Sequence, residues 1–171
     1  VLFIAAQGWI DPQRVVIRGG SAGGYTTLRA LTANTRGLFK AGASYYGVAD
    51  LTLLARDTHK FESRYLDRLI SPYPEAEALY QARSPINAVS QANTPIIFFQ
   101  GLQDKVVPTN QAEVMVAALR AKGLAVEYLA FAEEGHGFRQ AQNVRAALEA
   151  EWAFYARVLG FLSHCSCQRT I

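Results

Sequence analysis

The chain has 171 residues, half of them hydrophobic, with 18% charged residues and a formal net charge of +3. That length suits one compact domain, and no uninterrupted apolar run reaches the roughly 18 residues that a membrane span needs. The 17 Lys and Arg are scattered singly instead of forming a basic stripe, so we expect no nucleic acid and no membrane among the partners of this chain.

Apolar runs of strand length alternate with stretches of helical periodicity along the chain. Residues 1–8 resemble the end of a helix, so we expect the chain to be a piece of a longer domain. The predicted strands lie near 14–18, 41–46, 95–100 and 126–131, and the predicted helices near 22–33, 61–70, 75–83, 110–122 and 141–161. This alternation predicts an α/β fold with a parallel sheet, whose functional residues gather at the carboxyl ends of the strands.

The first strand leads into a glycine-rich turn, Gly19-Gly20-Ser21-Ala22-Gly23, and then into a helix. A Gly-x-Ser-x-Gly run between a strand and a helix is typical of a nucleophile elbow. The turn strains the serine backbone and brings strand and helix so close that only glycine fits beside it. Ser21 is the predicted nucleophile, with helix-start amides facing a developing oxyanion. The alternative is a chance Gly/Ser loop.

The segment after the second strand is the predicted wall of a substrate pocket, because it leaves the sheet beside the elbow. We expect Tyr46 and Val48 to form this wall, with Phe61 and Tyr65 further out, and an apolar or aromatic substrate preference. The alternative is that these side chains fill the core beneath a helical lid.

The loop after the third strand carries the predicted acid. A buried strand at 95–99 is followed by Gln100-Gly101-Leu102-Gln103-Asp104. A catalytic histidine needs a carboxylate that fixes its tautomer, and Asp104 has the strongest context for that role. Asp50 is the second candidate, and a turn-forming or helix-capping role is the alternative for Asp104.

Two helices contribute predicted core stripes. Their apolar positions are Ala112, Val114, Met115, Ala118 and Leu119 in one helix, and Trp152, Phe154, Tyr155, Val158 and Leu159 in the other.

A serine hydroxyl needs a base, and the chain has three histidines. His136 follows the fourth strand between Gly135 and Gly137, which let the loop place the imidazole over the sheet edge. His59 lies in a polar stretch and His164 in the final segment, so His136 is the predicted base. A solvated loop histidine is the alternative.

The final segment holds both cysteines, Cys165 and Cys167, which are too close for an easy disulfide. With His164 they lack a second ligand cluster, so we expect no metal and no cofactor. We expect residues 163–171 to be a disordered tail.

The chain order Ser21, Asp104, His136, each after a separate strand, is the order found in α/β-hydrolases. The sequence resembles the C-terminal part of the catalytic domain of the prolyl oligopeptidase family, in its acylaminoacyl-peptidase and dipeptidyl-peptidase-like branch. The runs that carry the resemblance are residues 11–25, 39–42, 84–86, 101–108 and 134–138. The resemblance implies the C-terminal portion of a mostly parallel α/β-hydrolase sheet flanked by helices, over residues 1–162.

The resemblance also implies an activity, namely a serine-type peptidase that hydrolyses oligopeptides through an acyl-enzyme on Ser21. Its acid would be Asp104, its base His136, and its oxyanion donor the backbone amide of Ala22. The implied partners are the upstream part of the hydrolase domain and an N-terminal β-propeller, and a homo-oligomer stays open. Cysteine usage fits a reducing compartment, so we expect a cytoplasmic protein. A carboxylesterase and a catalytically silent binding fragment are the alternatives.

Overall fold

The computed structural model describes residues 1–33, 37–57 and 65–161. In chain order they form α1 (Leu2–Ala6), β1 (Val16–Gly20), α2 (Ala22–Thr32), β2 (Ala41–Tyr45), α3 (Leu51–Asp57), α4 (Tyr65–Leu69), α5 (Glu77–Arg83), the 3-10 helix η1 (Pro85–Gln91), β3 (Ile96–Gly101), α6 (Asn110–Ala121), β4 (Val126–Phe131) and α7 (Ala141–Leu159). Residues 162–171, which include the predicted tail, lie outside the described residues.

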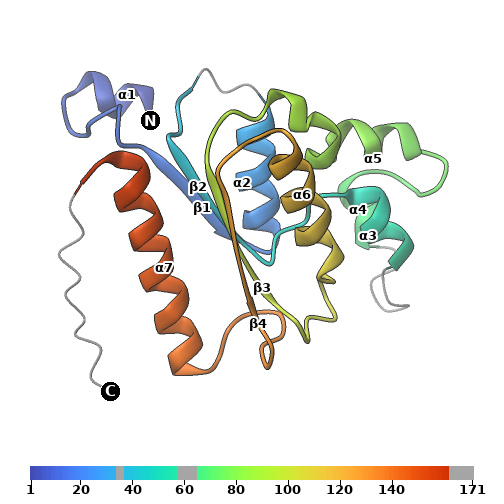
Figure 1. Cartoon of the computed structure of the whole chain (residues 1–171). Coiled ribbons are helices and arrows are strands. Elements are labelled where there is room, and N and C mark those ends of the chain that lie inside the picture. The colour runs from blue at the N-terminus through green and yellow to red at the C-terminus, as the bar shows by residue number, and fades with distance from the viewer. Residues whose placement is uncertain (34–36, 58–64, 162–171) are drawn as a thin grey trace.

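The structure confirms the four predicted strands as one parallel sheet in the order β1-β2-β3-β4. Helices α2 and α6 cover one face of this sheet and α7 covers the other (Figure 1). Side chains of β3 therefore alternate between two cores: Ile96 and Phe98 pack with α2 and α6, whereas Ile97 and Phe99 pack with α7. Because both faces are covered, β3 is a continuous apolar run in the sequence.

Strand β1 and two short helices differ from the sequence-based expectation. β1 starts at Val16 and continues through Gly20, so the elbow glycines Gly19 and Gly20 belong to the strand. The prediction missed α3 and η1. Asp50 is the sequence signal for α3, because aspartate is a favoured residue at the start of a helix. In the structure its carboxylate accepts hydrogen bonds from the Thr52 and Leu53 amides, as a helix cap does. Asp50, the second candidate acid, therefore caps α3.

Two predicted core positions are wrong. Trp152 is 50% exposed and packs against Phe161, and Val114 is 37% exposed. The buried face of α7 follows Ala147, Glu151 and Phe154, a stripe that Trp152 falls beside. The helical periodicity predicted both helices correctly. Which side of each helix is buried depends on the elements that pack against it.

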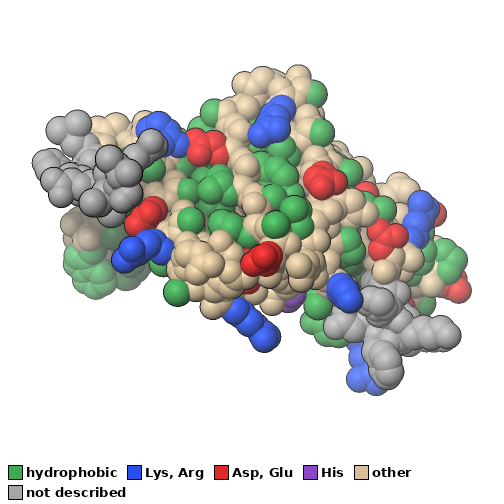
Figure 2. Space-filling model, turned by 60° about the horizontal axis from the view of Figure 1, so that its bottom comes forward, with side chains coloured by type: hydrophobic (Ala, Val, Ile, Leu, Met, Phe, Trp, Pro, Cys, Tyr) green, Lys and Arg blue, Asp and Glu red, His purple; other side chains and the backbone are tan. Residues whose placement is uncertain are grey.

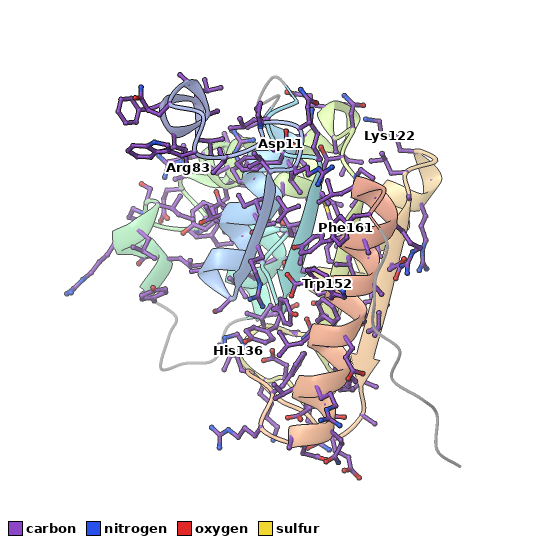
Figure 3. All side chains as sticks on the ribbon, turned by 90° about the vertical axis from the view of Figure 1, so that its left-hand side faces the viewer. Asp11, Arg83, Lys122, His136, Trp152 and Phe161 are labelled. Atoms are coloured by element: carbon purple, nitrogen blue, oxygen red, sulfur yellow. The ribbon has the colours of Figure 1, made fainter. Side chains whose placement is uncertain are left out.

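The described strands end at the same edge of the sheet, and this edge carries Ser21, Asp104 and His136. In Figure 3, His136 lies at the opposite end of the molecule from Asp11 and Lys122, which precede β1 and β4. On the face shown in Figure 2, Lys and Arg side chains are dispersed among neutral ones. Within the described ranges, we find no helix with the length and apolar character that crossing a bilayer requires.

Candidate active site

Ser21 occupies the sharp turn between β1 and α2. Its backbone has φ 56° and ψ −120°, outside the regions that L-residues prefer, at a cost of order 1–3 kcal/mol. A Cβ on Gly19 would lie 2.3 Å from the carbonyl oxygen of Gly23, so both the turn and the close approach of strand and helix require glycine. The Ser21 amide donates to the Tyr45 carbonyl at 2.9 Å, which fixes the elbow to the end of β2.

Asp104 lies in the loop that follows β3, and its side chain has no exposed surface. One carboxylate oxygen, Oδ1, accepts hydrogen bonds from the backbone amides of Val106 and Val107, both at 2.9 Å. The other, Oδ2, faces Nδ1 of His136 at 2.9 Å. Both oxygens are thus held in place, and Oδ2 is directed at the imidazole.

His136 connects the acid to the serine. Its Nε2 lies 2.8 Å from Ser21 Oγ, and its imidazole is 24% exposed. Because a carboxylate can only accept, Nδ1 of the neutral imidazole must carry the proton and Nε2 must accept from the serine hydroxyl. The structure thus brings together the three residues that the sequence pattern selected.

The contact between Asp104 and His136 requires that the two loops that carry them approach closely. A Cβ on Gly101 would lie 2.4 Å from the carbonyl oxygens of both Glu134 and Gly135, so the acid loop can touch the histidine loop only with glycine there. The backbone of Gln103 donates to the Glu134 carbonyl at 2.9 Å. On the other side of the histidine, Gly137 has φ +92°, which favours glycine.

Glu134 holds the histidine loop against the start of α7, and sequence reasoning gave it no role of its own. Its buried carboxylate accepts hydrogen bonds from the amides of Arg139 at 3.0 Å and Gln140 at 2.9 Å, and from the Asn143 side chain at 2.9 Å. Burial alone would raise the pKa of Glu134, but these hydrogen bonds and the Arg139 charge together hold it below its ordinary value. The charged form therefore stabilises the loop that carries His136.

We expect Glu134→Gln to lower the melting temperature at neutral pH, because an amide cannot accept all three hydrogen bonds. The carboxylate has a lower pKa in the folded than in the unfolded protein, so its contribution is present above the unfolded value and is lost as the pH falls through the folded one. The difference in melting temperature between the two proteins should therefore shrink as the pH falls from neutral through the folded-state pKa of Glu134. The exposed neighbour variant Glu133→Gln is the matched control. Equal melting temperatures of wild type and Glu134→Gln at neutral pH would contradict this role.

The first turn of α2 begins directly at the nucleophile. Ser21 is the N-cap and Ala22 the first helical residue, and amides at this position have no partner within a helix. The position suits the Ala22 amide to receive a developing negative charge next to Ser21 Oγ.

An apolar cavity of about 360 Å³ adjoins the serine. The structure places Val48 and Tyr65, two of the predicted pocket residues, in its wall. Phe61 lies outside the described residues. The remaining lining residues are Ser21, Ala22, Tyr25, Leu51, Leu54, Leu66, Leu69, Ile70, Arg83, Val106 and Val107.

Several of these lining residues were missed by sequence reasoning. Tyr25 comes from the elbow helix, and Leu51 and Leu54 come from α3, which was not predicted. The spacing of the two leucines within a capped helix was the signal that could have found them.

Tyr46 does not line this cavity. Its ring lies 4.9 Å from that of His136, centroid to centroid, and contacts Phe138 as well. The expectation of Tyr46 in the pocket wall is corrected accordingly. The Tyr46 backbone turns at φ 38° directly after β2, and its side chain contacts His136 and Phe138 instead.

The described residues contain no group of three His, Cys, Asp or Glu side chains that could hold a metal ion. His59, His164, Cys165 and Cys167 lie outside those residues.

Comparison with known proteins gives a family match over nearly all of the chain. The model of the prolyl oligopeptidase family matches residues 1–161. Dipeptidyl aminopeptidase BIII from Pseudoxanthomonas mexicana is 31% identical over 170 aligned residues, which cover 96% of this chain and 24% of that protein. Esterase LipQ from Mycobacterium tuberculosis is 36% identical over 155 residues, which cover 82% of this chain and 37% of the esterase.

A solved structure of a Mycobacterium tuberculosis puromycin-hydrolyzing peptidase has the same architecture. It superposes with a TM-score of 0.90 at 46% identity, over 94% of this chain and 24% of that one. The chain thus spans about a quarter of the length of the two peptidases that it matches.

Proposed function

The chain belongs to the prolyl oligopeptidase family, and from that premise we propose that it carries the catalytic side chains of a serine peptidase acting on oligopeptides. The proposal depends on the hydrogen-bonded series from Ser21 Oγ through His136 to Asp104, at 2.8 and 2.9 Å. Among the described residues, this arrangement supplies a base within reach of the strained serine and an acceptor for the proton on the far ring nitrogen.

The proposed reaction is acyl transfer to water. Ser21 Oγ attacks the substrate carbonyl carbon while its proton moves to Nε2 of His136, and the Ala22 amide donates to the resulting oxyanion. When the C–N bond breaks, the same proton passes to the departing amine, which leaves an acyl-enzyme. A water then loses a proton to Nε2 and attacks the acyl carbon, and Ser21 leaves with that proton. Asp104 stabilises the imidazolium in both halves.

The apolar cavity beside Ser21 is the proposed site for the side chain on the acyl side of the scissile bond. Val48, Leu51 and Leu54 offer apolar surface there, and about 360 Å³ is enough space for a leucine or phenylalanine side chain. The charged residue in the lining is Arg83, so a cationic side chain buried there would have no oppositely charged partner, which is costly. The substrate is therefore proposed to carry an apolar or aromatic residue at this position.

A panel of chromogenic amides and esters tests both proposals in the full-length protein. We expect amide hydrolysis, with kcat/KM at least about tenfold higher for leucine or phenylalanine than for lysine on the acyl side. Substrates that differ only in amide or ester linkage separate peptidase from esterase activity. Equal rates for lysine and leucine would contradict the specificity proposal, and ester cleavage without amide cleavage would contradict the peptidase proposal.

Two alternative functions can be tested against the peptidase proposal. The similarity to Esterase LipQ favours a carboxylesterase as the second candidate, because the same residues could cleave an ester. A silent binding domain is the third, and a fluorophosphonate probe separates it from both enzymes. A nucleophilic Ser21 is labelled covalently by the probe, whereas a silent domain stays unmarked.

Further parts of the protein, its oligomeric state and its location are also proposed. The two matched peptidases are about four times as long as this chain, which supports an upstream part of the hydrolase domain and an N-terminal β-propeller as partners in the same protein. A second oxyanion donor is proposed to come from that upstream part. A homo-oligomer and a cytoplasmic location are proposed on the family resemblance and the sparse cysteines.

A further inference from the structure

Tyr46 has an unusual backbone conformation at the edge where the catalytic side chains meet. Its φ of 38° lies in the left-handed region, which bulky residues adopt at a cost of order 1 kcal/mol or more. The strain is held in place because the Tyr46 amide donates to the Phe99 carbonyl at 2.7 Å, next to the bond between the Ser21 amide and the Tyr45 carbonyl. Such a conformation persists only where surrounding contacts favour the resulting side-chain direction.

The ring of Tyr46 contacts both the base and its loop. It packs on the imidazole of His136 with 4.9 Å between centroids and a tilt of 59°. It meets Phe138, two residues further along the same loop, edge to face at 5.4 Å and 81°. Gly20 also approaches the ring, since a Cβ there would lie 3.0 Å from a Tyr46 ring carbon. The ring therefore lies against both the residue before the nucleophile and the loop of the base.

The hydrogen bonds of His136 leave one motion of the ring poorly restrained. Ser21 and Asp104 hold the two nitrogens in the plane of the imidazole, but they oppose tilting about the line through those nitrogens only weakly. A side chain packed against the imidazole opposes that tilt, and the Tyr46 ring supplies such a contact at 4.9 Å between centroids. A misplacement of about 1 Å at a reacting group can cost roughly 100-fold in rate.

We propose that Tyr46 is a positioning residue that holds the His136 imidazole in line between Ser21 and Asp104. The inference rests on the proposed function, since it assigns Tyr46 to the same site. It also replaces the pocket-wall role that the sequence suggested.

The ring, and not the hydroxyl, carries this role. Among the described residues, the Tyr46 hydroxyl has no hydrogen-bond partner. Burial and the nearby Asp104 carboxylate raise the pKa of Tyr46, with the Arg18 guanidinium acting in the opposite direction, so the phenol stays neutral at physiological pH. A neutral aromatic surface is therefore what faces the imidazole.

The test compares Tyr46→Phe and Tyr46→Leu in the full-length protein. We expect Tyr46→Phe to keep kcat within about twofold, and Tyr46→Leu to lower kcat roughly 10- to 100-fold with KM unchanged. Tyr128→Leu is the matched control, because Tyr128 is a partly buried tyrosine that packs against the core cluster of α2 and α6. Tyr46→Met replaces the leucine variant if that variant does not fold.

A spectroscopic readout separates failure of this inference from failure of the proposed function. In protein labelled with isotopic histidine, ring-current shifts from Tyr46 should displace the His136 imidazole resonances in wild type and Tyr46→Phe, and should be lost in Tyr46→Leu. This readout holds whether or not the protein hydrolyses peptides. Unchanged resonances in Tyr46→Leu, a kcat equal to that of Tyr128→Leu, or a rise in KM alone would overturn the positioning role.

Discussion

Ser21→Ala is expected to reduce peptide hydrolysis by the full-length protein roughly 10⁴- to 10⁶-fold. The reason is geometric, because Ser21 Oγ is the hydroxyl that His136 Nε2 approaches, at 2.8 Å, in a turn whose strain directs it outward. Alanine retains the backbone of the elbow, so KM for a peptide amide should change little. Steady-state kinetics and covalent labelling by a fluorophosphonate both measure the loss.

Two comparisons make this result specific. Ser44→Ala removes a buried hydroxyl on β2 that has no hydrogen-bond partner among the described residues, so we expect the activity of this variant to be close to wild type. The double variant Ser21→Ala/His136→Ala should be no slower than Ser21→Ala alone, because the base has no function without its nucleophile. Wild-type amidase activity in Ser21→Ala would refute the assignment of the nucleophile.

The three polar side chains of the site could be predicted because each depends on local signals. Ser21, Asp104 and His136 each follow a run that is visibly a strand, and parallel strands end at one sheet edge. The flanking glycines added steric information, since Gly19 must accommodate the carbonyl of Gly23. Strand pattern and turn chemistry were therefore enough to bring together residues more than a hundred positions apart.

The apolar part of the site could not be predicted in the same way. The direction of Tyr46 depends on a positive φ at a residue that is not glycine, and the glycine that follows it gave no indication of this turn. The role of Glu134 depends on amides five and six residues later, which approach its carboxylate only after α7 has packed. Both features arise from tertiary contacts, which a periodic pattern does not encode.

The residues that line the cavity could be predicted only in part. Val48 was found because it leaves β2 beside the elbow, but Leu51 and Leu54 required α3. The cap of that helix, Asp50, was instead weighed as a catalytic acid. A carboxylate at the end of a strand is compatible with both roles, and only its contacts with the Thr52 and Leu53 amides separate them.

Asp104→Asn is expected to lower kcat by about 10⁴-fold while leaving the fold intact. An asparagine can still accept from the amides of Val106 and Val107 through Oδ1, so the loop should keep its shape. Its Nδ2 would then face Nδ1 of His136 and donate a hydrogen bond to it. The imidazole would then have to carry its own proton on Nε2. A protonated Nε2 cannot accept the proton of Ser21.

The loss should appear as a fall in kcat for amide substrates with little change in KM or melting temperature. Asp50→Asn is the matched control, because Asp50 caps α3 through one carboxylate oxygen that asparagine retains, and its kcat should stay near wild type. If instead Asp50→Asn abolished turnover and Asp104→Asn did not, the acid would be Asp50. The tautomer argument for Asp104 would then fail, because a 2.9 Å contact with Nδ1 would have no kinetic consequence.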